Sequence, residues 1–275
     1  MAASVFNGSF IKEASLSLSP IRPDLREAFD FREVTVVCGS LNGQSMVQIG
    51  NSIVYSTVFG EIVSPHLDKP NEGRIFINVD SSGVSEAGIS DPRGMNDNLL
   101  LSNYVERVLR GSKAIDTESL CVLGGKSVWS IRVDIRVVSS DGSLLDVCTL
   151  GALTGLLNFR HQSVQVEGYA ATVFATHSRE PVHLSVHHLP ISSTFVLVDA
   201  GNRVFCMADP TSAEETTFHS TFSVACNQHG ELCSIHKPGG VAIEESLVMA
   251  CMEVSVRRAK EVSMVVQAAL QQVRS

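Results

Sequence analysis

One segment, from residue 144 to residue 157, carries apolar residues on nearly every face of the helix that its spacing predicts. The segment reads LLDVCTLGALTGLL, and Asp146 is its one charged residue. A helix that is apolar all round has no face to turn toward water, so it has to be buried centrally in the fold. This requirement constrains the fold more than any other feature of the sequence.

The segment before this helix predicts a strand with one core face. In SVWSIRVDIRVV, residues 127–138, the polar residues Arg132, Asp134 and Arg136 alternate with apolar neighbours. An alternation of period two is typical of a half-buried strand. The linking residues 139–143, SSDGS, are either a turn between strand and helix or a cradle for phosphate.

The remaining elements form two groups in which strands precede a helix. The first group has strands at 31–37, 46–49, 52–63 and 74–79, a loop at 82–98 and a helix at 99–112. Gly50-Asn51 predicts a hairpin turn between the second and third strands. The second group has strands at 163–166, 172–175, 184–188, 194–198, 222–226 and 232–236, then a helix over about 242–273. This order predicts an α+β fold with two related halves, at about 31–165 and 180–260.

The composition limits the classes of partner. The net charge is -8 and hydrophobic residues make up 44% of the chain, so a large core is expected and a wholesale electrostatic grip on nucleic acid is not. The 7 cysteines show no CxxC spacing, which is typical of reduced thiols in an intracellular protein. The N-terminal residues lack the pattern of a secretory signal, and no run approaches the ~18 apolar residues of a membrane span, so no membrane partner is expected.

Three cations, Arg107, Arg110 and Lys113, recur at every third position at the end of the helix predicted over 99–112. The apolar stripe of that helix lies elsewhere, so the three cations should form a slanting basic row on the surface. Such a row is most often a solvated helix face. The alternative is contact with an anionic ligand.

Three other groups resemble functional sites, and each has a commoner structural explanation. Residues 124–127, GGKS, resemble the end of a phosphate-binding loop, but they lead into a strand and leave no helix N-terminus for phosphate. His183 and His187 would share one face of a strand, with His188 beside them, yet no carboxylate or cysteine close in sequence completes a metal site. The acidic group in ADPTSAEE, residues 208–215, could bind Mg²⁺ or act as acid and base, but an exposed acidic loop is the commoner outcome. We therefore predict no metal site and no cofactor.

Several stretches together resemble the RNase PH family. They are ERVLRGSKAIDTESLCV (106–122), GKSVWSIRVDIRVVSSDG (125–142), LTGLLNFR (153–160), EPVHLSVHHLPI (180–191) and GELCSIHKPGG (230–240). Within the family the chain is most similar to a ring subunit of the eukaryotic RNA exosome. The resemblance implies an RNase PH-like fold, with two βαβ-type halves like domain 2 of ribosomal protein S5, mixed sheets with packed helices, and a long C-terminal helix. Residues 1–275 would then form a single RNase PH-like unit.

The same resemblance implies partners and a location. The partners are other RNase PH-like ring subunits, cap subunits with RNA-binding domains, single-stranded RNA in a central channel, and an associated hydrolytic nuclease. The location is the nucleus, including the nucleolus, and the cytoplasm.

The resemblance also bears on the residues that precede the central helix. Active members of the family place a Gly-Ser/Thr-Arg triplet there, whose N–H groups and guanidinium hold phosphate. Residues 143–145, Ser-Leu-Leu, match that triplet, and leucine offers no donor. Active members also carry two aspartates six residues apart; Glu215 and Thr221 match them, so the second carboxylate is missing. The resemblance thus implies no catalytic residue in this chain and favours a turn, with Asp141 or Ser143 as helix N-cap.

The N-terminal motif of the family, Arg-x-Asp-Gly-Arg, shows one departure. Residues 22–26 read RPDLR, so Leu25 replaces the glycine and the local turn is expected to differ.

Taken together, these observations predict a catalytically inactive ring subunit in which Arg107, Arg110 and Lys113 contact RNA phosphates. The alternative is a phosphorolytic 3′→5′ exoribonuclease, which would need an arginine at position 145. A free RNA-binding protein of a different class would need a strongly basic domain or interleaved aromatics, whereas the chain has 1 Trp and 3 Tyr.

Overall fold

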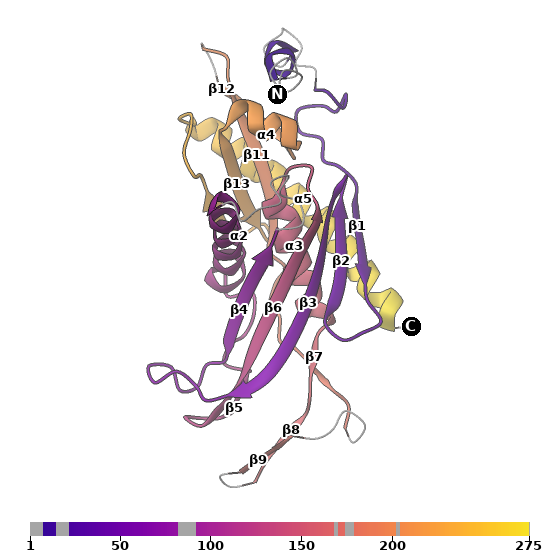
Figure 1. The fold of residues 1–275 in the computed structure, drawn as a ribbon, viewed down its shortest axis with the longest axis vertical. Helices are drawn as coiled ribbons and strands as arrows, with labels where there is room; N and C mark the ends of the chain where they lie inside the picture. The colour runs from indigo at the N-terminus through magenta and orange to yellow at the C-terminus, as the bar shows by residue number, and fades with distance from the viewer. Residues whose placement is uncertain are drawn as a thin grey trace.

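The computed structural model describes residues 8–14, 22–81, 92–167, 170–173, 179–201 and 204–274. Two β-sheets enclose helices α3 (Leu144–Asn158) and α5 (Glu245–Arg274), which contact strands of both sheets (Figure 1). Helix α2 (Pro92–Gly111) packs on a strand at the edge of the first sheet, and α4 (Ser212–Phe218) packs on the second. A short helical segment covers residues 8–14.

The first sheet is mixed, with the strand order β1-β2-β3-β6-β4, and β5 also pairs with β6. Its strands are β1 (Val34–Cys38), β2 (Gln44–Ile49), β3 (Ser52–Val63), β4 (Arg74–Asp80), β5 (Cys121–Leu123) and β6 (Ser127–Ser139). Strand β4 runs parallel to β6, and the other pairs are antiparallel.

The second sheet is antiparallel, with the strand order β12-β11-β13-β14. Its strands are β11 (Ile191–Asp199), β12 (Val204–Ala208), β13 (Thr221–Cys226) and β14 (Leu232–His236). Two small ladders lie between the sheets in sequence: β7 (Arg160–His161) pairs with β10 (Val182–His183), and β8 (Val164–Glu167) pairs with β9 (Ala170–Val173).

Helix α3 is the centre of the core, as its composition requires. Every residue from Asp146 to Leu156 is buried. The helix lies so close to β3 that a Cβ added at Gly155 would be 2.5 Å from the Ser56 Oγ atom. A side chain at this position would push the helix off the sheet, so the glycine permits the close approach of helix and strand.

Several predicted elements are confirmed. The strand, turn and central helix over 127–157 are present as β6 and α3, and the hairpin of β2 and β3 turns at Gly50, which has a φ of 56°. The C-terminal helix is α5, and the mixed sheets with packed helices agree with the α+β class.

Other predictions are wrong in identifiable ways. The loop predicted over 82–98 from its Gly, Ser, Asp and Asn content contains the start of α2, whose first residue, Pro92, is tolerated in the first turn of a helix. The strand predicted over 184–188 is absent, since β10 ends at His183. The strand β12 was not predicted although VFCMA is a continuous apolar run, and the helix α4 spans only 7 residues, too few for an apolar periodicity to show. Residues 174–175, predicted as a strand end, lie outside the described residues.

All 7 cysteines are free thiols, and 5 of them are buried, in keeping with the prediction of reduced thiols. Among the described residues, no helix combines the length and the apolar character needed to cross a bilayer.

Candidate functional site

The three predicted cations lie at the C-terminal end of α2, but the helix ends before Lys113. Lys113 has a φ of 55°, and its N–H donates to the Arg110 carbonyl at 3.1 Å. The next N–H, of Ala114, donates to the Leu109 carbonyl at 3.2 Å. This pair of bonds is the Schellman pattern that ends helices, with lysine at the position where glycine is usual. The helical spacing of the basic row therefore does not extend to Lys113.

The three cations also differ in their partners. The Arg110 guanidinium forms a salt bridge with Glu106 at 3.0 Å, and both side chains are exposed. Arg107 and Lys113 have no salt-bridge partner among the described residues, and both are exposed. Burial, with a smaller contribution from the charge of Arg107, lowers the pKa of His236 on β14. Arg107 and Lys113 are thus the cations whose charge is least neutralised.

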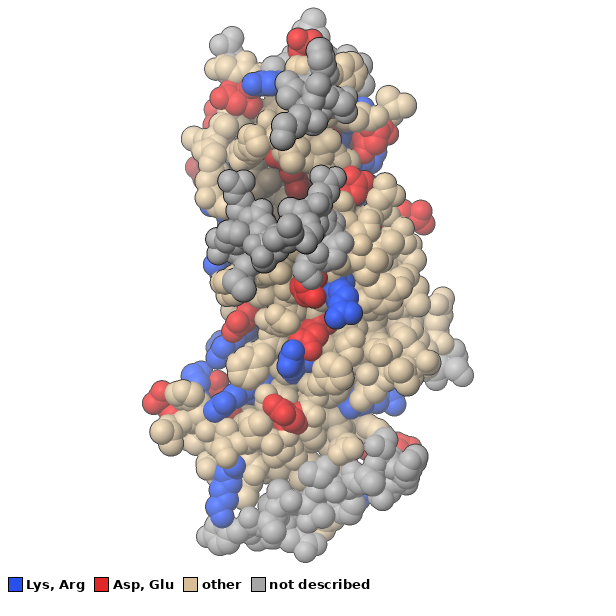
Figure 2. Space-filling model, viewed as in Figure 1, with Lys and Arg blue, Asp and Glu red and all other residues tan. Residues whose placement is uncertain are grey.

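A hollow of about 410 Å³ lies beside this end of α2, and its lining is balanced in charge. Three cationic residues line it, Lys69, Arg110 and Lys113, and three anionic residues line it as well, Glu72, Asp116 and Glu118. Lys69 is itself paired with Glu72 at 2.7 Å. Over the described residues of the face in Figure 2, cationic and anionic side chains are likewise interspersed. The region does not form a continuous basic stripe on that face, so any anion contact here must use individual cations.

The second region of interest is the N-terminus of α3, where the predicted turn is confirmed. Ser143 occupies the N-cap position with a φ of 52°, but its side chain does not cap the helix. Its hydroxyl lies 3.1 Å from the Pro210 carbonyl and donates to it, while its backbone N–H donates to the Glu215 carboxylate at 2.9 Å. Anions are favoured at helix N-termini by the free N–H groups and the helix dipole. Here a carboxylate of the same chain takes that place.

Two carboxyl groups at this helix end are held at unusual pKa values. Burial raises the pKa of Glu215 to about 7, although the bond from the Ser143 N–H opposes the shift. Burial also raises the pKa of Asp146, in the first turn of α3, to about 6. Asp146 accepts bonds from the Thr194 N–H at 2.7 Å and from the Thr194 hydroxyl at 2.8 Å. Glu215 thus links α4 to the start of α3, and Asp146 links α3 to β11 of the second sheet.

The acidic group at 208–215 is not an exposed loop, so that expectation is wrong. Glu214 is 0% exposed and accepts two bonds from the Arg22 guanidinium, at 2.9 and 2.8 Å. Asp209 is also buried and accepts from Arg32, at 2.6 and 2.9 Å, and from Arg26, at 3.1 Å. Burial alone would raise the pKa of Asp209, but the arginines outweigh it and hold that pKa below its usual value. Charged groups are rarely buried unless they are paired in this way.

The departure at Leu25 leaves the turn in a conformation that suits glycine. Leu25 has a φ of 61° and its side chain is 84% exposed. The turn positions Arg22 and Arg26 for their contacts with Glu214 and Asp209. The left-handed backbone is present at this turn, and the leucine carries a strain that glycine would not.

The remaining groups around this helix end offer little to an anionic substrate. Leu144 and Leu145 are half-buried and pack against the core. Thr221 opens β13 and pairs with Val196 in the sheet. The arrangement is a set of satisfied hydrogen bonds and ion pairs, and the matched triplet supplies no guanidinium.

The other motifs take structural places. Gly125, with a φ of 74°, and Lys126 form the turn into β6, as the prediction of a strand after GGKS requires. His183 ends β10, whereas His187 and His188 lie outside the named strands. His183 and His187 therefore do not share a strand face. Among the described residues, no group of three or more His, Cys, Asp or Glu side chains is placed to hold a metal ion.

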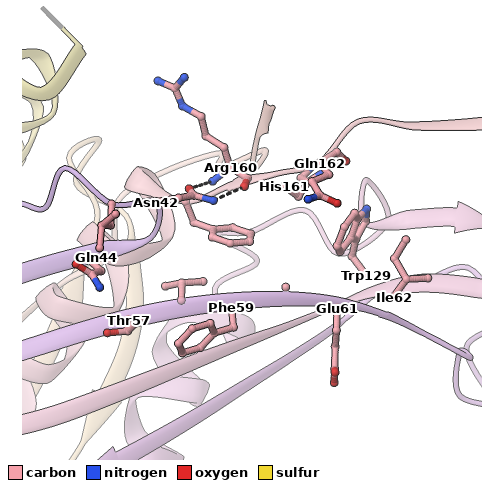
Figure 3. Close-up of a pocket in the computed structure, with 14 residues that line it drawn as sticks. Asn42, Gln44, Thr57, Phe59, Glu61, Ile62, Trp129, Arg160, His161 and Gln162 are labelled. Atoms are coloured by element: carbon pink, nitrogen blue, oxygen red, sulfur yellow. Dashed lines mark hydrogen bonds between the residues drawn. The ribbon is translucent and has the colours of Figure 1, made fainter. Parts of the chain in front are cut away.

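Sequence reasoning missed the largest of the hollows described here, of about 650 Å³, beside the middle of β3 (Figure 3). Its wall holds the ring of Trp129, whose centroid lies 5.2 Å from that of His161. The amide of Asn42 donates to the Arg160 carbonyl and accepts from the Arg160 N–H, each at 2.7 Å, and thereby ties the turn between β1 and β2 to β7 (Figure 3). No local pattern marks this hollow because its residues come from four separate parts of the chain.

Comparison with known proteins connects these features to a family. Residues 30–162 match the model of the 3′ exoribonuclease family, domain 1, and residues 188–258 match that of domain 2. The chain is 34% identical over 250 residues to the exosome complex component RRP45 of Bos taurus, covering 91% of this chain and 56% of that protein. It is 33% identical over 268 residues to RRP45A of Arabidopsis thaliana, covering 96% of this chain and 86% of that protein.

A solved structure shows the same fold. A chain of the Archaeoglobus fulgidus exosome with RNA bound to the active site superposes with a TM-score of 0.81. The two chains are 24% identical, and the match covers 96% of this chain and 99% of the archaeal one. The fold expected from the sequence, RNase PH-like with mixed sheets and a long C-terminal helix, is confirmed.

Proposed function

The chain belongs to the RNase PH (3′ exoribonuclease) family and is homologous to exosome complex component RRP45, and we propose that it is a ring subunit of an RNA exosome core without a catalytic site of its own. The chain spans 56% to 63% of the length of several RRP45 relatives, so their activity and partners are carried over here as a proposal. Its role would be in 3′→5′ RNA processing and decay.

One observation carries the proposed lack of catalysis: Leu145 stands at the start of α3, where active members of the family place the phosphate-binding arginine. In a phosphorolytic enzyme of this family, an attacking phosphate would need this N-terminus and a nearby guanidinium. The helix end already holds a carboxylate, that of Glu215, which accepts the Ser143 N–H. A phosphate dianion would meet negative charge and apolar side chains there, which disfavours binding.

The proposed partners follow from the family. They are other RNase PH-like ring subunits, cap subunits with RNA-binding domains, single-stranded RNA and an associated hydrolytic nuclease. We also propose that residues 1–275 act as one RNase PH-like unit with halves at about 31–165 and 180–260, in the nucleus, nucleolus and cytoplasm.

We propose RNA contact by Arg107, Arg110 and Lys113, through phosphates and without sequence preference. The two cations without salt-bridge partners among the described residues, Arg107 and Lys113, should contribute most. Arg110 is neutralised in part by Glu106. The acidic lining beside them would keep this contact weak until other subunits add cations.

The test is an RNA degradation assay on the chain coexpressed with its RNase PH-like neighbours. Any release of nucleoside diphosphates in the presence of phosphate should be unaffected by mutations in this chain. Two variants are compared in this assay. One carries Glu215→Ala in this chain, and the other carries alanine in place of the corresponding carboxylate of the neighbouring subunit. Phosphorolysis that Glu215→Ala abolishes would support the alternative, a phosphorolytic exoribonuclease. Nucleoside monophosphates as products would instead point to a hydrolytic contaminant.

A second measurement tests assembly. Expressed alone, the chain should self-associate, because sheet edges and apolar side chains such as Phe59 and Phe76 remain exposed. Coexpression with an RNase PH-like partner should give a soluble heterodimer. A stable monomer at micromolar concentration in gel filtration would contradict the ring role.

A further inference from the structure

Strand β3 is longer than the strand that pairs with its outer edge. β2 pairs with β3 from Ile49 opposite Ser52 to Gln44 opposite Thr57. One further bond follows, from the Val58 N–H to the Gly43 carbonyl at 2.9 Å. Beyond it, β3 continues to Val63 paired with β6 alone among the described residues.

The main-chain groups left on this edge can be identified from the ladder. Backbone N–H and C=O groups of alternate residues in a strand point to the same side. Because the Val58 N–H points toward β2, those of Gly60 and Ile62 do also, while Phe59 and Glu61 turn theirs to β6. Within the described part of the chain, no hydrogen bond reaches the edge groups of Gly60 or Ile62.

The hollow of about 650 Å³ runs along this same edge. Its floor includes the consecutive residues 57–62. Neighbouring side chains in a strand point to opposite faces of the sheet, so a hollow that touches all six residues must lie along the edge of the strand. Phe59 and Glu61 point away from Trp129 and His161 (Figure 3). The apolar wall is formed by Trp129 and Phe159, which are 6% and 5% exposed.

From these features we propose that the edge of β3 at residues 59–63 is a docking site for an extended peptide segment of a partner protein. The segment adds to the first sheet beside β3, in line with β2, and bonds the N–H and C=O groups of Gly60 and Ile62. Strand addition of this kind draws its affinity from main-chain bonds and its specificity from pockets for alternate side chains. The free edge of five residues, 59–63, spans roughly 17 Å, which matches a short strand. The occupant carries an apolar side chain at the position that enters the hollow toward Trp129.

The same surface is poorly suited to RNA. The faces of Trp129 and Phe159 are buried, whereas unpaired bases stack on exposed aromatic faces. The rim holds Glu61 as well as Arg160, so it lacks the excess of cations that phosphates require. The free N–H and C=O groups along this edge match the hydrogen-bonding groups of another β-strand. This inference stands independently of the proposed exosome role.

The first experiment identifies the occupant in the native complex. A photoreactive benzoylphenylalanine replaces Leu41, which lines the hollow and is 64% exposed, and the tagged chain is purified from its own cells after irradiation. A second chain carries the same group in place of Leu67, which is 96% exposed and does not line the hollow, and serves as the control for position. We expect the probe at position 41, and not the one at 67, to attach to one short segment of another protein. Attachment to RNA, to the chain itself or to nothing would overturn the proposal.

The second experiment tests the main-chain bonds, with a synthetic peptide of the attached segment as probe. Ile62→Pro removes the edge N–H and leaves the bonds to β6 intact, and Ile62→Ala removes the same side chain but keeps the N–H. We expect Ile62→Pro to bind the peptide about tenfold more weakly than Ile62→Ala. Equal affinities would exclude strand addition.

Hydrogen exchange of the unmodified chain decides the matter if Ile62→Pro does not fold. The peptide should slow exchange at the Gly60 and Ile62 amides by about tenfold or more, and leave Phe59 and Glu61, already bonded to β6, unchanged. Protection that does not alternate along β3 would overturn the proposal.

Discussion

The N-terminus of α3 and the C-terminal end of α2 could each bind an anion, and they differ in what surrounds them. At α3 the free N–H group of Ser143 is bonded to Glu215, and the neighbouring carboxylates are paired with buried arginines. At α2 the cations are exposed, and Arg107 and Lys113 have no salt-bridge partner among the described residues. The first region is closed by the chain's own groups, and the second is open to solvent.

Under the proposed function, the fold is kept while its catalytic site is lost. In this chain the matched Glu215 bonds the Ser143 N–H, and the nearby Glu214 and Asp209 are paired with arginines that contribute to stability. The open region contributes little to stability and is free to change. The predictions below test this contrast, in order of their expected effect on the free energy of unfolding.

The largest effect should come from breaking the buried pair at the closed region. Arg22→Ala leaves the Glu214 carboxylate buried without its partner, and removal of one member of a buried pair costs about 3–5 kcal/mol. Lys69→Ala, which removes the exposed pair with Glu72, is the matched control and should cost less than about 1 kcal/mol. Urea unfolding of the coexpressed heterodimer, followed by circular dichroism, measures both. Equal costs would mean that the closed region is not a source of stability.

The next effect concerns the pH dependence at Glu215. Its pKa in the folded chain is raised to about 7, so the folded state holds a proton that the unfolded state releases at lower pH. The stability from this group is therefore present at low pH and is lost as pH rises toward 7. Glu215→Gln keeps an oxygen that accepts the Ser143 N–H and removes the titration, so it should stabilise the chain at pH 8 by about 1–3 kcal/mol.

The measurement is the urea midpoint of wild type and Glu215→Gln at pH 5 and pH 8. The gap between the two proteins should widen at the higher pH. Asp146, whose pKa is raised to about 6, contributes to the pH dependence of stability in both wild type and Glu215→Gln. A gap that is the same at both pH values would show that Glu215 is not held at a raised pKa.

A smaller gain is expected at the turn that delivers Arg22 and Arg26. Leu25→Gly relieves the left-handed backbone strain and loses little packing, because the side chain is 84% exposed. After the entropy that glycine costs in the unfolded chain, a gain of about 0.5–1 kcal/mol remains. Leu25→Ala is the control, since it removes the side chain without relieving the strain. If both variants raise the midpoint of thermal unfolding equally, the gain comes from removal of the exposed leucine side chain and not from relief of backbone strain.

The smallest effect on stability belongs to the open region. Replacing Arg107, Arg110 and Lys113 with alanine should change the free energy of unfolding by less than about 0.5 kcal/mol. If all three contact phosphates in the assembled ring, the salt slope of single-stranded RNA binding should fall by roughly 0.7 per contact.

The measurement is RNA affinity at several salt concentrations for rings of matched composition. Arg110→Ala alone should change the slope less than Lys113→Ala, because Arg110 is paired with Glu106. Identical curves for wild-type and triple-variant rings would mean that these cations are only a solvated surface. A ring that fails to assemble would place them in a subunit interface instead.

Local patterns in the sequence were sufficient where one element alone sets the outcome. The all-round apolar composition of 144–157 required a central helix, and the alternation in 127–138 required a half-buried strand. Gly50-Asn51 marked the hairpin turn. The substitution of leucine for arginine at position 145 was also visible from the residues and the family resemblance, because it depends on one position.

The tertiary structure decided which distant groups meet. Arg22 and Glu214 are 192 residues apart, and neither residue's neighbours in sequence indicate that both are buried. The acidic stretch looked exposed because burial of a charge depends on a partner that short patterns do not include. Likewise, the free edge of β3 exists because β2 is shorter than β3, and the length of one strand does not set that of the next. Sequence periodicity fixed which side of each element is apolar, whereas packing between elements fixed which polar groups were satisfied and which were left free.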